Sequence, residues 1–377
     1  MDFSFTAEQE QVRASLAGYL RDHHNFATRQ AAVASDDGRC TALWQGFAER
    51  LGLFGLAGPD APDPFDILVV MQELGAALVA EPFLESAVTS ATLLRACDTD
   101  AAAGLVRQIA SGEGVVVLAD AERGARLGSP PALTRAQPDA QGWHLNGAKS
   151  MVMAAPWATT LLVSATTPDG PAIFAVDPAS AGVSLYRYRT IDGRRAADIR
   201  FDDVVVPAEQ LIASPETAAA AIEAAVDATI AALAAEALGV MRRILSDTIA
   251  YTRDRRQFGQ PIAGFQALQH RMVDMFMKIE AATSATYLAT LKLGAPARAR
   301  ALAISGAKVL VGDACRFVGQ NGVQLHGGMG MTDELAIGHY FKRATVIEAL
   351  FGTSDDHLAR YMAISSPPSQ SLGIAAE

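Results

Sequence analysis

One long alanine-rich segment near the middle of the chain limits the possible folds most strongly. From Ala218 to Arg253, small and apolar residues continue without a proline. This stretch is too long for one strand and has the composition of a long helix. The segments 263–293, 297–322 and 333–362 also predict helices, so we expect a C-terminal helical bundle.

The beginning of the chain predicts a second helical region. Thr6 and Gln9 have the spacing of a capping box, and apolar residues on one face then continue the helix over 6–22. A helix over 41–53 ends before prolines at 59, 62 and 64, and another is expected over 65–79. The chain stays alanine-rich and helical up to about Ser111.

The pattern changes to short strands at Gly112. Apolar runs separated by turn residues, and a strand that enters a turn at Gly147, predict a small β domain that Pro207 closes. We therefore divide the chain into an N-terminal helical domain (1–112), a middle β domain (113–212), a C-terminal helical bundle (213–364) and a flexible tail (365–377). The predicted strands lie at 115–118, 142–147, 161–164, 172–176 and 199–201.

Composition excludes several classes of protein. The chain has 377 residues, of which 50% are apolar and 19% charged, with a net charge of −10. An acidic surface argues against a nucleic-acid binder. Cys40, Cys97 and Cys315 lack metal-ligand spacing, so we expect no metal site and reduced thiols in a cytoplasmic protein. No signal peptide is visible, and we expect no membrane span.

Three short motifs in the last third of the chain carry the functional signal: Arg255–Gly259, Gln324–Gly328 and Phe351–Ser354. Together they resemble the C-terminal half of the acyl-CoA dehydrogenases, flavoproteins that desaturate CoA thioesters. The stretch Asp198–Pro207 resembles the strand by which that family leaves its β domain. Asn321–Gly328 and Gly338–Arg343 resemble most closely the small subunit of pimeloyl-CoA dehydrogenase and related two-subunit (α2β2) bacterial enzymes.

The resemblance implies an α+β, mostly α fold: N-terminal helices, a small β domain and a C-terminal four-helix bundle. In that family FAD lies across a subunit boundary, and the neighbouring subunit holds its pyrophosphate and adenine end. Arg255 matches the arginine that pairs with the pyrophosphate, a role that suits a planar guanidinium. The other residues of this neighbour-facing set are Phe258, Gln266, Gln324, Gly327 and Gly328.

The set that faces the flavin ring within one subunit is altered. The family usually carries Thr-Glu-Pro-Gly-Ala-Gly-Ser-Asp in its β domain, where this chain has 120–126 without the proline or the serine. Met151 and Met153 stand where a tryptophan and a threonine are usual, and methionine donates no hydrogen bond. Thr353 and Ser354 match own-subunit FAD contacts, but Asp355 replaces a common glutamine.

The catalytic base of the family is absent from its usual position. The resemblance places that glutamate at Phe351, and in some members at Thr229, which Ile230 follows. None of these three residues can accept a proton. Glu236 lies on the same helical face as Thr229, in an apolar setting, and Glu348 lies three residues before Phe351. Both are candidates for a relocated base, and both are also candidates for buried structural roles.

These observations leave three hypotheses. The first is a base-lacking subunit that completes the FAD sites of a second acyl-CoA dehydrogenase-like subunit in a heterotetramer. That enzyme would desaturate a CoA thioester between its α and β carbons and reduce an electron-transfer flavoprotein. The second is a self-sufficient homotetramer that uses Glu236 or Glu348 as its base. The third is a non-catalytic scaffold that has lost FAD.

Overall fold

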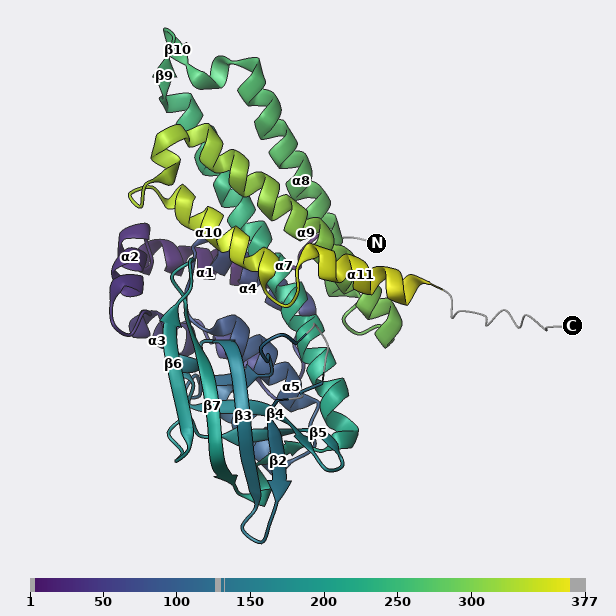
Figure 1. Cartoon of the computed structure of the whole chain (residues 1–377). Coiled ribbons are helices and arrows are strands. Elements are labelled where there is room, and N and C mark those ends of the chain that lie inside the picture. The colour runs from purple at the N-terminus through teal and green to yellow at the C-terminus, as the bar shows by residue number, and fades with distance from the viewer. Residues whose placement is uncertain (1–3, 126–129, 132, 367–377) are drawn as a thin grey trace, which may run out of the picture.

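The structure is a computed structural model of the chain, and it describes residues 4–125, 130–131 and 133–366. Helices dominate both ends and a sheet occupies the middle of the sequence (Figure 1). The expected fold class is therefore confirmed, while the domain boundaries at 112 and 212 stay predictions. The N-terminal elements are α1 (Ala7–His23), α2 (Phe26–Ala34), α3 (Thr41–Glu49), α4 (Pro64–Ala76), the π-helical η2 (Leu84–Ser90), α5 (Ala91–Arg95) and α6 (Asp100–Ala110).

The first helix begins as its sequence predicts. The Thr6 hydroxyl accepts the backbone N–H of Gln9, and the Gln9 side chain accepts the backbone N–H of Thr6. This capping box satisfies two of the N–H groups that every helix start leaves unpaired. Gln9 also donates to Asp66 at the start of α4 at 3.0 Å, so the cap ties α1 to the next layer.

The strands β1 to β8 form one mixed sheet, drawn at the lower end of Figure 1. Its order is β6-β7-β3-β2-β4-β5-β8, and β1 pairs in parallel with β4. The pairing between β3 and β7 contains two register shifts, one near Gly147 and one after Lys149. The strands are β1 (Val116–Ala119), β2 (Arg135–Pro138), β3 (Trp143–Met153), β4 (Thr160–Thr167), β5 (Gly170–Val176), β6 (Val183–Arg189), β7 (Arg195–Val206) and β8 (Leu211–Ala213).

The C-terminal helices extend away from the sheet (Figure 1). The long helix expected over 218–253 is α7, which runs from the sheet to the far end of the molecule. A two-residue turn joins the short strands β9 (Arg256–Gln257) and β10 (Gln260–Pro261) at that end. The helices of this region are α7 (Pro215–Asp254), α8 (Gln266–Leu291), α9 (Ala297–His326), α10 (Ala336–Ala349) and α11 (Ser354–Ser365).

The single helix expected over 333–362 is wrong, because the chain breaks into α10 and α11. Phe351 and Gly352 have φ angles of 56° and 94°, a conformation that ends a right-handed helix. Thr353 then caps α11 by accepting the backbone N–H of Asp356. Helix-compatible residues on both sides concealed the break, which lies at Phe351-Gly352-Thr353 between α10 and α11.

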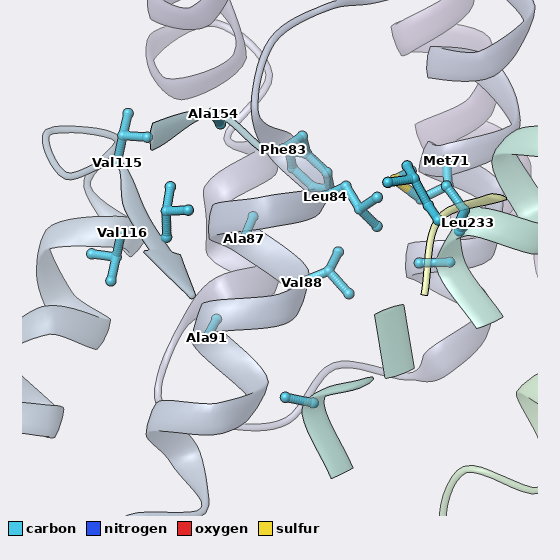
Figure 2. Packing of buried hydrophobic residues seen from close by; sticks show 14 of the residues in the cluster. Met71, Phe83, Leu84, Ala87, Val88, Ala91, Val115, Val116, Ala154 and Leu233 are labelled. Carbon is cyan, nitrogen blue, oxygen red and sulfur yellow. The ribbon is translucent and has the colours of Figure 1, made fainter. Parts of the chain in front are cut away.

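The N-terminal helices pack on α7 through small residues. Gly75 of α4 lies against the backbone of Glu236, and Gly239 of α7 lies against the backbone of Gln72. A side chain at either glycine would overlap the opposite helix, so the two axes approach closely only because both residues lack Cβ. The segment that carries Leu84 and Ala91 lies between β1 and the α4–α7 pair, and Figure 2 shows Val115 and Val116 on one side of it and Met71 and Leu233 on the other.

Two further expectations concern the C-terminal tail and a membrane span. Of the predicted tail, 365–366 are described as the end of α11 and its cap, and 367–377 lie outside the described residues. In the described part of the chain, α7 alone is long and apolar enough to cross a bilayer. Of the most apolar 18-residue stretch of that helix, 61% is buried inside this fold, as in the core helix of a globular domain.

Candidate functional site

The C-terminal motifs meet in a pocket at the far end of α7. Its volume is about 700 Å³, and it lies between the end of α7, the first turns of α8 and the end of α9 (Figure 1, upper end). The predicted residues Arg255, Gln324, Gly327 and Gly328 all line this pocket. Arg255 and Gln324 are 69 positions apart in the sequence, but they share one cavity because α7 and α9 end side by side.

The polar side chains of this pocket suit an anion. Arg255 is the exposed residue that ends α7, and its backbone N–H caps the helix by donating to Tyr251 O at 2.8 Å. Arg271 supplies a second guanidinium from the second turn of α8, and Asn321 on α9 accepts from it at 3.1 Å. Two guanidiniums and the amide of Gln324 are the donors that a pyrophosphate prefers. The sequence analysis missed Arg271, which stands five residues after Gln266.

The glycine turn leaves the floor of the pocket bare. Gly327 has a φ of 61° and ψ of −143°, which favours glycine. Gly328 has no such requirement, and a Cβ added at either position would meet nothing within 4 Å. In contrast, a Cβ at Gly330 would press on Val323 O at 2.7 Å. Neither packing nor the backbone conformation requires glycine at position 328. A bare backbone there fits the close approach of a ligand.

A stacked ring pair holds this end of the fold in place. Tyr251 of α7 and His326 of α9 stack with ring centroids 4.4 Å apart, and the Tyr251 hydroxyl donates to His326 O at 3.3 Å. The Nδ1–H of His326 donates to Gly322 O at 2.8 Å. Burial lowers the pKa of His326, so the ring is neutral near pH 7. His326 therefore positions the glycine turn and contributes no fixed charge.

Two predicted members of the neighbour-facing set lie outside the lining of this pocket. Phe258 is 88% exposed at the tip of the β9–β10 hairpin and has a φ of 53°. Its ring meets Phe265 edge-on at 6.0 Å. Gln266 is the exposed first residue of α8. Both point to the surface around the pocket, where a second chain can reach them, and their roles stay predictions.

Of the two positions at which the family keeps its base, the one at Phe351 meets an apolar cluster. Phe351 packs against a group of buried residues that includes Ile230 and Ala231. Thr229 turns to the other side of α7 and shares a 2.7 Å hydrogen bond with Thr89. The remaining members of this cluster are Ala289, Ile304 and Ala307.

Glu236 lies in a buried ion-pair network. Its carboxylate is 1% exposed and accepts two hydrogen bonds from Arg343, each of 2.7 Å, and one from Arg194 at 2.8 Å. Arg343 also donates to Asp192 at 2.9 Å. Burial alone would raise the pKa of Glu236, but the two arginines hold it below its usual value. A carboxylate held in this way joins α7, α10 and the loop before β7, and it is a poor proton acceptor.

Glu348 also has structural partners. Its Oε1 accepts the backbone N–H of Ser354 and a hydrogen bond from Arg316, both at 3.2 Å. Thr353 is engaged in the cap of α11, and the Ser354 hydroxyl is buried with no hydrogen-bond partner in the described structure. A Cβ added at Gly312 would overlap the Ser354 hydroxyl, so this oxygen is packed against α9, and Ser354 does not line the pocket of Arg255.

The altered β-domain motif is built around a buried ion pair instead. Lys149 is fully buried and donates to Glu122 at 2.9 Å and to Ser164 at 2.9 Å. Glu122 in turn accepts the backbone N–H groups of Leu133 and Thr134. Met151 is 50% exposed with a φ of 51°, and Met153 is half-buried. Arg126, at the end of the predicted motif, lies outside the described residues.

Comparison with known proteins agrees with this geometry. Two family models match the chain: "Acyl-CoA dehydrogenase, middle domain" over residues 116–204 and "Acyl-CoA dehydrogenase, C-terminal domain" over residues 219–363. The acyl-CoA dehydrogenase IpdE2 of Mycobacterium tuberculosis is 29% identical over 89% of this chain and 91% of its own length. The probable acyl-CoA dehydrogenase FadE25 of Mycobacterium tuberculosis is 30% identical, but the match spans only 62% of each protein.

A solved structure shows the same fold over nearly the whole chain. A variant of the Tcur3481-Tcur3483 steroid ACAD is 27% identical with a TM-score of 0.85, and the match covers 95% of this chain and 97% of that one. The matched models together cover most of the sheet and nearly all of α7 through α11. The chain belongs to the acyl-CoA dehydrogenase family.

Proposed function

We propose that this chain is a base-lacking subunit that completes the FAD site of a second acyl-CoA dehydrogenase-like subunit. One contrast carries the proposal. The pocket with Arg255, Gln324 and the bare Gly327–Gly328 turn suits a phosphate. Of the family positions for the base, Phe351 packs against an apolar cluster and Thr229 is hydrogen-bonded to Thr89. A chain with its own complete site would need both halves.

Each half of the site has a separate role in this proposal. Arg255 and Arg271 would hold the pyrophosphate of FAD, and the Gly327–Gly328 backbone would lie against the cofactor. When bound, FAD accepts a hydride from the β-carbon of the acyl thioester. The base, the substrate and the flavin ring would belong to the partner, and an electron-transfer flavoprotein would take the electrons. The name of the matched steroid ACAD, which joins two components, supports a two-subunit assembly.

The exposed face of α8 has the character of a subunit interface. Large apolar side chains stand on it at high exposure, which is unusual unless another surface covers them. The exposed Phe258 at the hairpin tip continues this surface next to the pocket. We propose that the partner subunit covers it. The exposed apolar residues of α8 are Val273, Phe276, Met277, Leu288 and Leu291.

The geometry gives the two other hypotheses less support. A self-sufficient enzyme would need Glu236 or Glu348 free to accept a proton, and each is engaged by arginine. A scaffold without FAD would have no use for a pocket that presents two arginines over a bare backbone.

The test compares neighbouring arginines in the complex of this chain with its partner. Replacing Arg255 with alanine removes a charge-assisted contact to phosphate, so we expect FAD to dissociate about tenfold more readily, or more. Arg256→Ala is the matched control, because Arg256 is equally exposed on β9 but does not line the pocket. Equal flavin content in the wild type and both variants would remove the main support for a shared site.

A further inference from the structure

Arg271 of α8 is held at the Arg255 pocket by a neutral side chain. Its Nη1–H donates to Asn321 Oδ1 at 3.1 Å, and Arg271 lines the pocket whereas Asn321 does not. Within the described residues, no carboxylate pairs with Arg271 or with Arg255. The Arg271 guanidinium therefore keeps its full charge. One of its five N–H groups is used by Asn321, and the others are open to a ligand.

Asn321 is itself fixed in orientation. Its Nδ2–H donates to Phe317 O, one turn earlier on α9, at 2.9 Å. With the amide nitrogen engaged on its own helix, the amide oxygen is the atom that meets Arg271. The half-buried amide thus holds a long side chain in one place. A ligand that binds an arginine already held in place removes less conformational freedom from it, which favours binding.

The same pair of helices uses a carboxylate where no pocket lies between them. About two turns after Arg271, Lys278 of α8 donates to Asp313 of α9 at 2.6 Å, and neither residue lines the pocket. Asp313 neutralises Lys278, whereas the amide of Asn321 makes a hydrogen bond without cancelling the charge of Arg271. An aspartate at position 321 would make a stronger pair with Arg271. The amide instead leaves that charge available to an anion.

Two arginines without carboxylate partners in one pocket favour a ligand with two neighbouring anionic groups. The chain as a whole carries a net charge of −10, so this local excess of positive charge is not a general property of its surface. A nucleoside diphosphate has two linked phosphates for the arginines and a planar base for an apolar wall. The pocket offers such a wall in Ile262, Leu268 and Leu325.

We infer that Asn321 is a positioning residue, which holds a fully charged Arg271 at the pocket so that this chain recognises a nucleoside diphosphate before any partner is bound. The inference rests on the proposed function, in which the diphosphate is that of FAD. The stack of Tyr251 on His326 fixes the glycine turn, so one chain forms both sides of the pocket. Because the chain supplies only part of the contacts to the cofactor, this binding is weak and is lost during purification. An equilibrium titration is therefore the suitable measurement.

Calorimetric titration of the full-length chain with ADP at pH 7 tests the inference, since ADP carries the same diphosphate as FAD. Asn321→Leu removes the hydrogen bond at nearly constant volume, so we expect the affinity for ADP to fall about fivefold. Asn321→Asp neutralises Arg271, so we expect a fall of about tenfold or more. In an Arg271→Met background, Asn321→Leu should have no further effect, because Asn321 acts only through Arg271.

Gln320→Glu is the matched control for added charge, because Gln320 is exposed beside Asn321 on α9 but does not line the pocket. It should change the affinity for ADP less than about twofold. If Asn321 served packing alone, its replacement by leucine would weaken ADP binding equally with and without Arg271, which would overturn the inference. A loss of affinity in Arg255→Ala with none in either Asn321 variant would also overturn this inference, and only this one. A wild-type chain that binds no ADP would overturn the shared flavin site as well.

Discussion

At the scale of single residues, Glu236 illustrates how context changes the role of a carboxylate. The sequence shows a glutamate among alanines and leucines, which by itself suggests a raised pKa and a base. The structure surrounds it with Arg343 and Arg194, which come from α10 and the loop before β7. Neither arginine is near Glu236 in sequence. Long-range pairing of this kind cannot be read from one helix.

Glu236→Gln should therefore destabilise the fold. The change leaves Arg194 and Arg343 buried with less negative charge, and breaking a buried pair in this way typically costs about 3–5 kcal/mol of unfolding free energy. Urea denaturation measures the loss. Glu223→Gln serves as the control, because its side chain is half-exposed and its pairs are long, so it should cost less than about 1 kcal/mol. A Glu236→Gln protein of unchanged stability that has lost turnover would instead identify a base.

A second buried glutamate makes stability depend on pH. Glu81 accepts the backbone N–H of Cys40 at the start of α3 at 2.8 Å, and burial raises the pKa of Glu81 to about 7. A folded-state pKa above the unfolded value of 4.5 means that the folded protein prefers the protonated form. The contribution is fully present below pH 4.5 and is lost as pH rises through about 7.

Glu81→Gln should remove that dependence. Relative to the wild type, the variant should gain up to about 3 kcal/mol of stability between pH 4.5 and pH 8, following the size of the pKa shift. Unfolding free energies by urea titration across this range give the difference. Glu49→Gln, at an exposed position of α3, should show a nearly constant difference. A constant difference for Glu81→Gln as well would contradict the account.

At the scale of elements, the crossing of α4 and α7 depends on two glycines. In a helix interior glycine is usually less favourable than alanine by about 0.5–1 kcal/mol. Gly239 is nevertheless required, because a Cβ there would overlap the backbone of Gln72, and Gly75 meets Glu236 in the same way. Close packing of two helices here outweighs the local preference for alanine.

Gly239→Ala should accordingly destabilise the chain by about 2 kcal/mol or more, since overpacking forces backbone shifts. Gly306→Ala is the matched change, in the interior of α9, where the nearest atom to an added Cβ is 3.7 Å away. It should be neutral or stabilising by up to about 1 kcal/mol. Thermal unfolding of the two variants should thus move in different directions. Equal effects would show that the α4–α7 contact is not the cause.

Local signals predicted most elements but not their breaks. The capping box at Thr6 and the alanine-rich pattern of α7 are properties of adjacent residues, so the sequence alone was sufficient for them. The break at Phe351 requires a positive φ at a residue that usually avoids it. Packing around Phe351 and a hydrogen bond from His357 to its carbonyl stabilise that conformation. The site was also predicted only in part. The motif residues were predicted from the sequence, but Arg271 and the arginines around Glu236 were not.

At the scale of the whole molecule, the phosphate-binding half of the proposed flavin site is kept in this chain, whereas the half that would supply the base is changed. The pocket at the end of α7 and α9 is lined by exposed donors, and the face of α8 beside it is apolar. Of the family positions for the base, Phe351 packs against apolar side chains, and Thr229 is buried and hydrogen-bonded to Thr89. Such a division is understandable if the chain works beside a different subunit that retains the base.

The most direct test of this account is the mass and flavin content of the purified chain, alone and after co-expression with a second subunit of the acyl-CoA dehydrogenase family from the same organism. The account predicts little or no bound FAD in the chain alone and about one FAD per pair of subunits in the complex. One FAD per subunit in an assembly of this chain alone, with turnover of an acyl-CoA, would contradict it.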